Sequence, residues 1–432
     1  MKKNTITDLY QSGYFSDIDL HFAKFITSFE KHEDPDIYLA AALVSRATGT
    51  GDGCLDLTTV AQKIIVFGKN GKNQIKPPEL SQWIKTLKQS RTVGSPGDVR
   101  PLILDHKSRL YLYRYWDYEQ RLSTAIMSRI HQDIGNIDLS ALKDGLNRLF
   151  PENENHPFNW QKVAAMMAAM KRFCVITGGP GTGKTFTMAK ILALLLELTP
   201  GKMLHILLAA PTGKAAARIG ESIKAAKKTL NCSEHVIGAI PSEATTLHRM
   251  LKTIPGSPYF YYNAENQLHA DVVVVDEVSM ADLALTAKLF EAVKSDARII
   301  LIGDRDQLAS VETGFVLADI CDRQNVQVFS TAFCQRFKDI TRQDMDVSQK
   351  SLKDRPGLYD HMVALNKSYR FADTGGIGQC SRAVNQGKID EALYLIKNSP
   401  DQISWKKLSR PDDISRFLPE IVIKGYSEYL NA

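Results

Sequence analysis

The sequence lacks any run of apolar residues long enough to cross a membrane. Its 432 residues are 44% hydrophobic and 24% charged, and no stretch approaches the roughly 18 consecutive apolar residues of a spanning helix. Lys2 and Lys3 stand near the start of the chain, but the apolar segment of a secretory signal does not follow them. A membrane role is therefore unsupported, and we expect the protein in the cytoplasm.

The sequence also lacks the spacing of a disulfide framework or a zinc site. Its six cysteines are scattered, without a CxxC pair and without nearby histidines at zinc-binding distances along the chain. Internal repeats and low-complexity tracts are missing as well. We therefore expect reduced, structural cysteines.

Net charge is small, at +6, which is too little to prove a polyanionic partner. The distribution of charge says more, because six basic residues fall within one short stretch: Lys202, Lys214, Arg218, Lys224, Lys227 and Lys228. They could line a nucleic-acid groove or form a solvated helix face. Charge alone favours the solvated face.

Residues 1–145 are expected to form a mainly helical N-terminal domain that docks on partner proteins. Asp36 to Arg46 has the pattern of a helix, and a hairpin is predicted where Leu102–Leu104 and Leu110–Tyr113 flank a polar turn. No catalytic constellation stands out in this region. Residues 146–157, which are polar and contain two prolines, predict a linker.

Beyond the linker, four short apolar runs predict the strands of a parallel sheet: Phe173–Thr177, Ile206–Ala210, Val272–Val275 and Ile299–Ile302. Each run is apolar nearly throughout, as expected for strands covered on both faces, and helical segments such as Met188 to Leu198 follow them. The fold class is therefore α/β, with a doubly wound parallel sheet. Ligands bind such sheets at the carboxyl ends of the strands.

A glycine-rich segment follows the first of these strands: Gly178, Gly179, Pro180, Gly181, Thr182, Gly183, Lys184 and Thr185. It matches the Walker A loop of P-loop ATPases, whose backbone N–H groups and following helix face the phosphates. In that loop the lysine, here Lys184, neutralises the β and γ phosphates. The hydroxyl of Thr185 would ligate Mg²⁺. ATP and Mg²⁺ are therefore the predicted cofactors.

Acidic and amide side chains follow two further strands. Asp276 and Glu277 come directly after four valines, where one carboxylate can hold Mg²⁺ and the other can polarise the attacking water. Gln307 lies just beyond the fourth strand, where it can reach the γ-phosphate or its water. Because strand ends meet at one sheet edge, these residues are expected to gather there with Lys184 and Thr185.

The motifs ITGGPGTGKT, LAAPTGKAAAR, TTLHRML, DEVSM and GDRDQLASVE occur in this order. Their order resembles motifs I, Ia, Ib, II and III of superfamily 1 DNA helicases. The segments NWQKVAA and LNKSYRF are similar to one family within them, RecD, the alpha subunit of exodeoxyribonuclease V (RecBCD). The resemblance covers about 158–325 and 365–390 and is weaker before 150.

The resemblance implies roles for further residues. Gln161 would contact adenine, although a glutamine beside Trp160 could be plain surface packing. Arg370 would reach the γ-phosphate from a second motor domain, although a lone arginine is more often an ordinary ion pair. Six residues would touch single-stranded DNA through its backbone: Pro211, Thr212, Gly213, Lys214, Thr246 and His248. His248 could instead be a buried helix histidine.

The resemblance also implies a RecA-like motor domain over 158–332, carrying motifs Q to III, followed by a polar insertion at 333–362. Residues 363–432 would begin a second RecA-like domain, and the family's later motifs are not found in them. The chain therefore looks truncated at its C-terminus. We expect it to bind ATP, to hydrolyse it weakly and not to unwind DNA alone.

Three functions remain open from the sequence. The leading hypothesis is an ATP-dependent 5′–3′ helicase subunit that assembles with RecB-like and RecC-like subunits in double-strand-break repair and recombination. An assembly subunit that binds nucleotide without motor work, and a stand-alone superfamily 1 helicase, are the alternatives. A nuclease has little support, since no carboxylate and lysine cluster lies outside the ATP motifs.

Overall fold

A computed structural model describes residues 14–32, 34–67, 73–132, 134–135, 137–151, 158–308, 310, 312–321, 326–345, 358–367, 369, 375–398, 403, 405, 407–408, 410 and 412–430. The chain forms two compact units, Met1–Asn366 and Lys367–Ala432. None of the helices in the described ranges is long and apolar enough to cross a bilayer.

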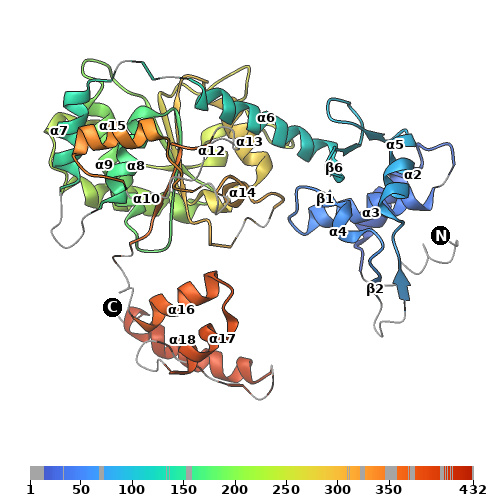
Figure 1. Ribbon diagram of the computed structural model, residues 1–432. Coiled ribbons are helices and arrows are strands. Elements are labelled where there is room, and N and C mark those ends of the chain that lie inside the picture. Colours follow the sequence, from blue (N-terminus) through green and yellow to red (C-terminus); the bar gives the residue numbers. More distant parts are fainter. Residues whose placement is uncertain are drawn as a thin grey trace. The chain divides into compact units, whose positions relative to one another are not determined.

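The N-terminal part of the first unit has its own hydrophobic core, built on helices α2 and α3 and on a small sheet of order β1-β6-β5-β4 (Figure 1). Trp83 and Leu102 are fully buried there. The elements are α2 (Asp17–Thr27), α3 (Pro35–Gly49), β1 (Leu55–Asp56), α4 (Leu57–Val60), β2 (Ile65–Phe67), β3 (Asn73–Ile75), α5 (Leu80–Gln89), β4 (Val93–Gly94), β5 (Leu102–Leu104) and β6 (Arg109–Leu112).

The predicted hairpin and the predicted helix of this part are confirmed. Strands β5 and β6 pair antiparallel, with Ile103 opposite Tyr111. The turn between them is held by Asp105, whose carboxylate accepts the backbone N–H groups of Lys107 and Arg109 at 2.9 and 2.8 Å. Helix α3 contains the whole predicted segment and begins at Pro35, behind an Asp34 cap that accepts the Asp36 N–H.

The larger sheet has six parallel strands in the order β12-β7-β11-β10-β8-β9. Their bounds are β7 (Phe173–Gly178), β8 (Ile206–Ala210), β9 (Thr245–Thr246), β10 (Val272–Val275), β11 (Arg298–Gly303) and β12 (Met362–Leu365). The four strands expected from the sequence are all present in this sheet. The doubly wound α/β fold is therefore confirmed.

Helices cover both faces of this sheet (Figure 1). One face packs against α7 (Leu139–Leu149), α8 (Trp160–Met170), α9 (Lys184–Glu197), α10 (Gly213–Lys227), α11 (Glu234–Ala239) and α15 (Thr331–Thr341). The other packs against α6 (Tyr113–Ile130), α12 (Leu247–Leu251), α13 (Leu283–Ala292) and α14 (Val316–Ile320).

Helices α6 and α7 belong to this larger core, although the sequence placed them in the N-terminal domain and the linker. Leu146 and Leu149 are buried against the sheet's helices. Arg129, at the end of α6, is 2% exposed, and its guanidinium donates to the carbonyls of Val293 and Lys294 at 2.7 and 3.0 Å. These carbonyls lie just after α13, where the last carbonyls of a helix have no partner within it. Packing thus extends the core back to Tyr113.

The region expected to be a polar insertion contains most of helix α15, which buries Phe333 and Phe337. Strand β12 begins at the last residue of this region and continues into the segment expected to begin a second RecA-like domain, but it is fully buried and pairs with β7 of the larger sheet. The charged residues Arg336, Lys338 and Asp339 lie on the other side of α15, so the charge seen in the sequence belongs to a solvated helix face. Residues 346–357 of the expected insertion lie outside the described residues.

His361 links β12 to the sheet and predicts a pH-dependent stability. It is 2% exposed, and its Nδ1 donates to the carbonyl of Phe173 at 2.7 Å. Burial lowers its pKa from 6.5 to about 4. As the pH falls from 6.5 towards 4, His361 is protonated in the unfolded chain but stays neutral in the folded protein. The free energy of unfolding therefore falls by roughly 3 kcal/mol over this range.

A His361→Gln variant should lose this part of the pH dependence, as measured by urea denaturation at neutral and mildly acidic pH. His32, which is exposed, supplies the control substitution His32→Gln. Equal pH profiles for the wild type and His361→Gln would contradict the expectation.

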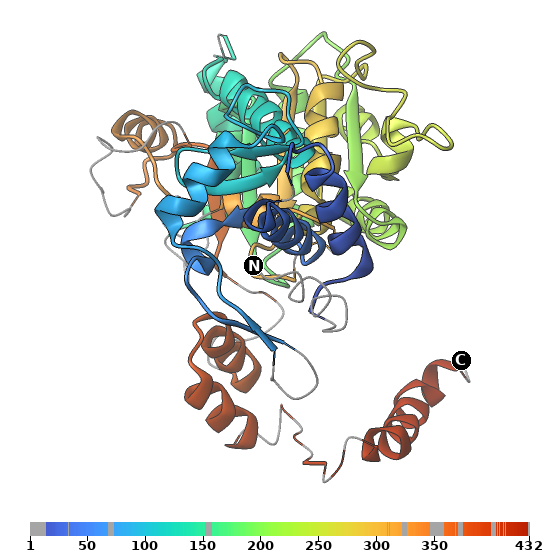
Figure 2. The same ribbon diagram turned by 90° about the vertical axis from the view of Figure 1, so that its right-hand side faces the viewer.

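The second unit consists of helices in its described residues, with no strand among them: α16 (Gly376–Asn385), α17 (Ile389–Asn398) and α18 (Asp413–Leu430). Helices α16 and α17 pack against each other as a pair (Figures 1 and 2). The start of a second RecA-like domain in this region stays a prediction.

Candidate nucleotide-binding site

The glycine-rich loop joins β7 to α9 at the carboxyl edge of the sheet. Gly181 and Gly183 have φ angles of +77° and +78°, which favour glycine because a side chain is strained there. A Cβ on Gly178 would lie 2.8 Å from Thr182 Oγ1 and 2.9 Å from the Leu365 carbonyl oxygen. The conformation of the loop therefore depends on its glycines, which also let the backbone approach phosphates closely.

Lys184 and Gln161 are both directed at this loop. The Lys184 ammonium donates to the carbonyls of Gly178 and Gly179 at 2.7 and 3.1 Å. The amide of Gln161, in the first turn of α8, donates to the Thr182 carbonyl at 3.3 Å. Gln161 therefore lies beside the loop, and its contact with adenine stays a prediction.

Thr185 and Asp276 meet across the site from two different elements. The hydroxyl of Thr185, at the start of α9, donates to Asp276 Oδ2 at 3.4 Å. Asp276 follows β10 and is 5% exposed. Burial raises the pKa of its carboxyl, and the hydrogen bond from the Glu277 N–H opposes that rise. A hydroxyl and a buried carboxylate at this separation are the oxygen ligands that Mg²⁺ prefers.

Glu277 is held in an uncommon backbone conformation, with φ 53° and ψ 36°. A non-glycine residue in this left-handed region costs of order 1 kcal/mol, and such strain is concentrated at functional sites. Its Oε2 is buried and has no hydrogen-bond partner among the described residues. A buried carboxylate oxygen left in this way is suited to accept a hydrogen bond from a water or ligand.

Gln307 is held by a residue that the sequence interpretation missed. Its Oε1 accepts a hydrogen bond from the Ser279 hydroxyl at 3.1 Å. Ser279 lies in η1 (Val278–Met280), the short helix that follows Glu277. Motif II, with the sequence DEVS, contains this serine. Its position two residues after Glu277 does not indicate that it bonds Gln307.

Asp304 is a second residue that was not singled out. It follows β11, is 7% exposed, and burial raises the pKa of its carboxyl while the Lys184 charge acts in the opposite direction. Its Oδ1 accepts the Asp306 N–H at 3.1 Å and thereby shapes the turn before Gln307. Its position at the end of an apolar strand was the signal that could have identified it.

The expected DNA-contacting residues line the next part of the same sheet edge. Thr212 caps α10 after β8, and Thr246 caps α12 after β9; the two strands are paired, with Ala210 opposite Thr246. Gly213 and Lys214 are exposed, while Pro211 is half-buried. These residues thus come from neighbouring strand ends and form one continuous edge.

His248 is exposed, so the alternative that it is a buried helix histidine is wrong. Its ring lies edge-on to Phe260, with the ring centroids 5.7 Å apart. Arg370, the arginine expected to reach the γ-phosphate, lies outside the described residues.

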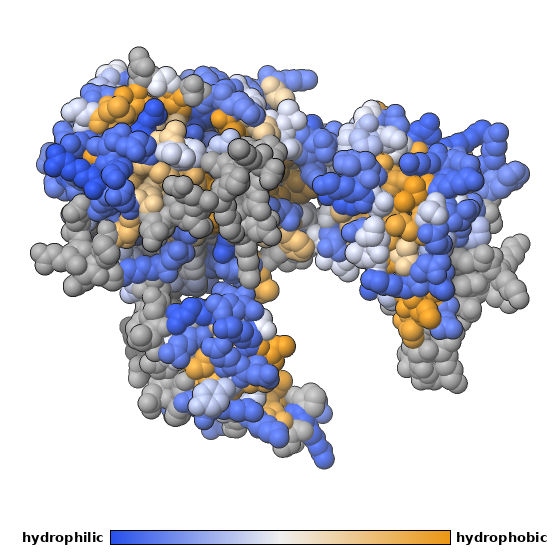
Figure 3. Space-filling model, viewed as in Figure 1, coloured by the Kyte–Doolittle hydropathy of each residue, from blue (hydrophilic) through white to orange (hydrophobic). Residues whose placement is uncertain are grey.

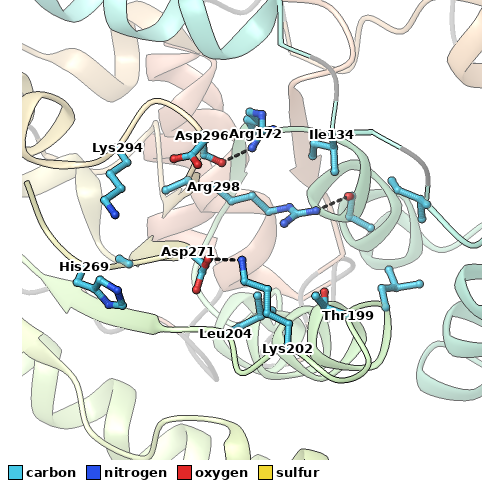
Figure 4. A pocket seen from close by; sticks show the side chains of 15 residues that line it. Ile134, Arg172, Thr199, Lys202, Leu204, His269, Asp271, Lys294, Asp296 and Arg298 are labelled. Atoms are coloured by element: carbon cyan, nitrogen blue, oxygen red, sulfur yellow. Dashed lines mark hydrogen bonds and ion pairs between the residues drawn. The ribbon is translucent and has the colours of Figure 1, made fainter.

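A pocket of about 380 Å³ lies at the edge of the sheet opposite to the glycine-rich loop (Figure 4). Its lining includes Arg172, Asp271 and Arg298, which stand at the amino ends of their strands. Lys202 pairs with Asp271 at 2.7 Å, and Arg172 donates to the Asp296 carbonyl. One ion pair therefore lies within this pocket, and the pocket is separate from the glycine-rich loop.

Metal clusters of other kinds do not occur in the described residues, since no group of three or more His, Cys, Asp or Glu side chains is placed to hold an ion. All six cysteines are free thiols, as the sequence indicated. The carboxylates of the glycine-loop site are therefore the ones to consider for Mg²⁺.

Comparison with known proteins matches two family models to the chain. Residues 161–313 match an AAA domain, and residues 11–111 match the N-terminal domain of the RecBCD enzyme subunit RecD. A solved structure of the Pif1 helicase from Candida albicans covers 49% of this chain and 40% of its own at 17% identity, but its TM-score of 0.23 is too low to carry an argument.

Three curated relatives match at higher identity. The RecBCD enzyme subunit RecD of Haemophilus influenzae is 37% identical over 74% of this chain and 50% of its own. The subunit of the same name from Mycobacterium tuberculosis H37Rv is 34% identical over 91% of this chain and 60% of its own. The ATP-dependent RecD2 DNA helicase of Deinococcus radiodurans is 34% identical over 49% of this chain and 26% of its own.

The chain spans about half to three fifths of the length of the first two of these relatives. The N-terminal core and five of the six strands of the larger sheet, β7 to β11, fall within the matched regions. On the combined strength of the two family models and these relatives, the chain belongs to the RecD family of superfamily 1 helicases.

Proposed function

We propose that this chain is the ATP-driven motor subunit of a RecBCD-type helicase-nuclease, moving 5′ to 3′ on DNA in double-strand-break repair and recombination. The observation that carries the proposal is the meeting of three motifs at one sheet edge. Lys184 lies in the glycine loop, Thr185 reaches Asp276, and Ser279 holds Gln307. An ATPase needs these groups together, because phosphate, metal and water must be bound at once.

The chain's own residues have distinct parts in this proposal. Lys184 and the loop N–H groups would hold the β and γ phosphates of ATP, and Gln161 would lie against its base. Thr185 and Asp276 would hold Mg²⁺, which supplies charge neutralisation of the phosphates when bound. Oε2 of Glu277 would orient and polarise water. Gln307 would contact the γ-phosphate, so that the loop after Gln307 would shift when the γ-phosphate is present.

Single-stranded DNA would run along the neighbouring strand ends. Thr212 and Thr246 offer hydroxyls there, and Lys214 offers an exposed charge. Such groups bind phosphates and sugars without reading the base sequence. This track is adjacent to the ATP site because both are built from the carboxyl ends of one sheet, which lets nucleotide turnover move the DNA.

The N-terminal domain is the proposed docking surface for RecB-like and RecC-like subunits. Apolar side chains gather on its surface (Figure 3). Phe25 and Phe29 on α2 are 58% and 52% exposed, and Val66 on β2 is 55% exposed. Exposed apolar groups in such number favour a protein partner. The match to RecBCD subunits over most of the chain supports an assembled subunit rather than a stand-alone helicase.

Magnesium-dependent nucleotide binding by the purified chain tests the site. We expect a fluorescent ATP analogue to bind in the presence of Mg²⁺ and to bind roughly tenfold more weakly after chelation, because Thr185 and Asp276 would hold a metal that neutralises the charge of the phosphates. Asp276→Asn should reduce this dependence on the metal. Failure to bind at millimolar nucleotide, with the fold intact by circular dichroism, would overturn the proposal.

A further inference from the structure

The loop that carries Gln307 ends on the N-terminal domain. Six residues after Gln307, the Thr313 hydroxyl donates to the carbonyl of Thr48 at 2.9 Å. The next N–H, that of Gly314, donates to the carbonyl of Gly51 at 2.9 Å. Thr48 lies in the last turn of α3, where the carbonyls of a helix lack partners within it. Gly51 lies two residues beyond the end of that helix. Two residues of the motor thus complete a helix end of the N-terminal domain.

This contact is specified by the residues on both sides. Thr313 is 5% exposed, so its hydrogen bond is shielded from water. Gly51 has φ +103°, and a Cβ there would lie 3.1 Å from the ring of Phe315. Gly314 also has φ +103°, and its Cβ would lie 2.5 Å from the Cβ of Leu283. Neither glycine leaves room for a side chain, so the close approach of the two segments depends on glycine at both positions.

The same loop is tied at its other end to the nucleotide site. Gln307 accepts the Ser279 hydroxyl at 3.1 Å, next to Glu277. Between the two ends, the Ser310 hydroxyl donates to the carbonyls of Glu312 and Gly314 at 2.8 and 3.3 Å. Ser310 is thus bonded to the segment that carries Thr313.

Space for such a shift exists beside the contact. A groove of about 590 Å³ lies along it, lined by Asp52 and Cys54 on one side and by Phe315 and Val316 on the other. Segments that border an open groove can slide without forcing a packed core apart, whereas densely packed interiors resist such change.

We infer that Thr313 and Gly314 are positioning residues that couple the γ-phosphate contact of Gln307 to the N-terminal domain. The inference rests on the proposed function of the ATP site, and it adds that this site is regulated through the N-terminal domain. Because coupling between two sites is reciprocal, a partner bound to the N-terminal domain would change affinity at the nucleotide site. ATP would likewise change how the partner is held.

Amide hydrogen exchange of the full chain, followed by mass spectrometry, tests the coupling. Three segments are compared with ADP and with a non-hydrolysable ATP analogue: the glycine loop at 178–186, the contact at 310–318 and the helix end at 46–54. We expect both nucleotides to protect 178–186. Only the triphosphate should change exchange at 46–54, by about fivefold, the factor for gaining or losing one net hydrogen bond.

Thr313→Val removes the hydroxyl while keeping the shape of the side chain. It should abolish the response at 46–54 and leave protection of 178–186 intact, and Thr313→Ser should restore the response. Thr341→Val is the matched control, because its buried hydroxyl bonds within α15, to the Phe337 carbonyl at 2.7 Å. Should Thr313→Val not fold, Gly51→Ala disturbs the same contact through Phe315 and should have the same effect.

Two outcomes would overturn the inference. One is equal exchange at 46–54 with ADP and the triphosphate while 178–186 is protected. The other is a full response in Thr313→Val. Absence of protection at 178–186 with either nucleotide is a different result, since it would refute the proposed ATP site itself and the inference with it.

Discussion

Replacing Glu277 with glutamine is expected to slow ATP hydrolysis by roughly 10² to 10⁴-fold, the usual contribution of a general base. The side chain keeps its size in Glu277→Gln, but the amide cannot take a proton from water. Its Oε2 is buried and has no hydrogen-bond partner within the described part of the chain, and the backbone of Glu277 is in the left-handed region. Because Glu277 would act on the attacking water and does not hold the phosphates, nucleotide affinity should stay close to that of the wild type.

Single-turnover hydrolysis in the assembly reconstituted with partner subunits measures this effect, and binding of a fluorescent ATP analogue measures affinity. Glu265→Gln, at an exposed position, is the matched control and should leave both unchanged. Wild-type hydrolysis by Glu277→Gln would remove Glu277 from the mechanism. An equal loss of binding and hydrolysis would mean that the residue supports the site only structurally.

The motor sheet was predictable because its strands are unusual in composition. Val272–Val275 consists of four valines, and such runs form strands only where both faces are covered. Once the strands are placed, the rules for parallel sheets put the residues that follow them at one edge. Lys184, Thr185 and Asp276 could therefore be grouped from sequence alone, and the structure brings them together.

Features that depend on distant packing could not be predicted in this way. Strand β12 lies more than 180 residues along the chain from its partner β7, with Met362 opposite Val175, and four residues give no periodic signal. Helix α6 has the same amphipathic pattern whichever core it joins. Its place is shown only by its packing in the fold, where Arg129 at its end bonds the carbonyls that follow α13. Ser279 was missed for a related reason, because its partner Gln307 comes from another strand.

Replacing Lys184 with glutamine decides between a motor and an assembly subunit. The ammonium is aimed into the glycine loop, where it bonds Gly178 and Gly179. Removing a charge that stabilises the transferring phosphate costs about 10² to 10³-fold in rate or more. In the reconstituted assembly we expect Lys184→Gln to abolish unwinding that starts from 5′ ends, while the assembly still forms.

Lys190→Gln is the matched control for that variant. Lys190 lies on the same helix, but its amine lies over the rings of Phe150 and Phe186, at 4.9 and 4.7 Å from their centroids, away from the loop. It should unwind DNA as the wild type does. If Lys184→Gln also unwinds DNA from 5′ ends normally, the chain contributes no motor work, and binding of nucleotide then serves assembly alone.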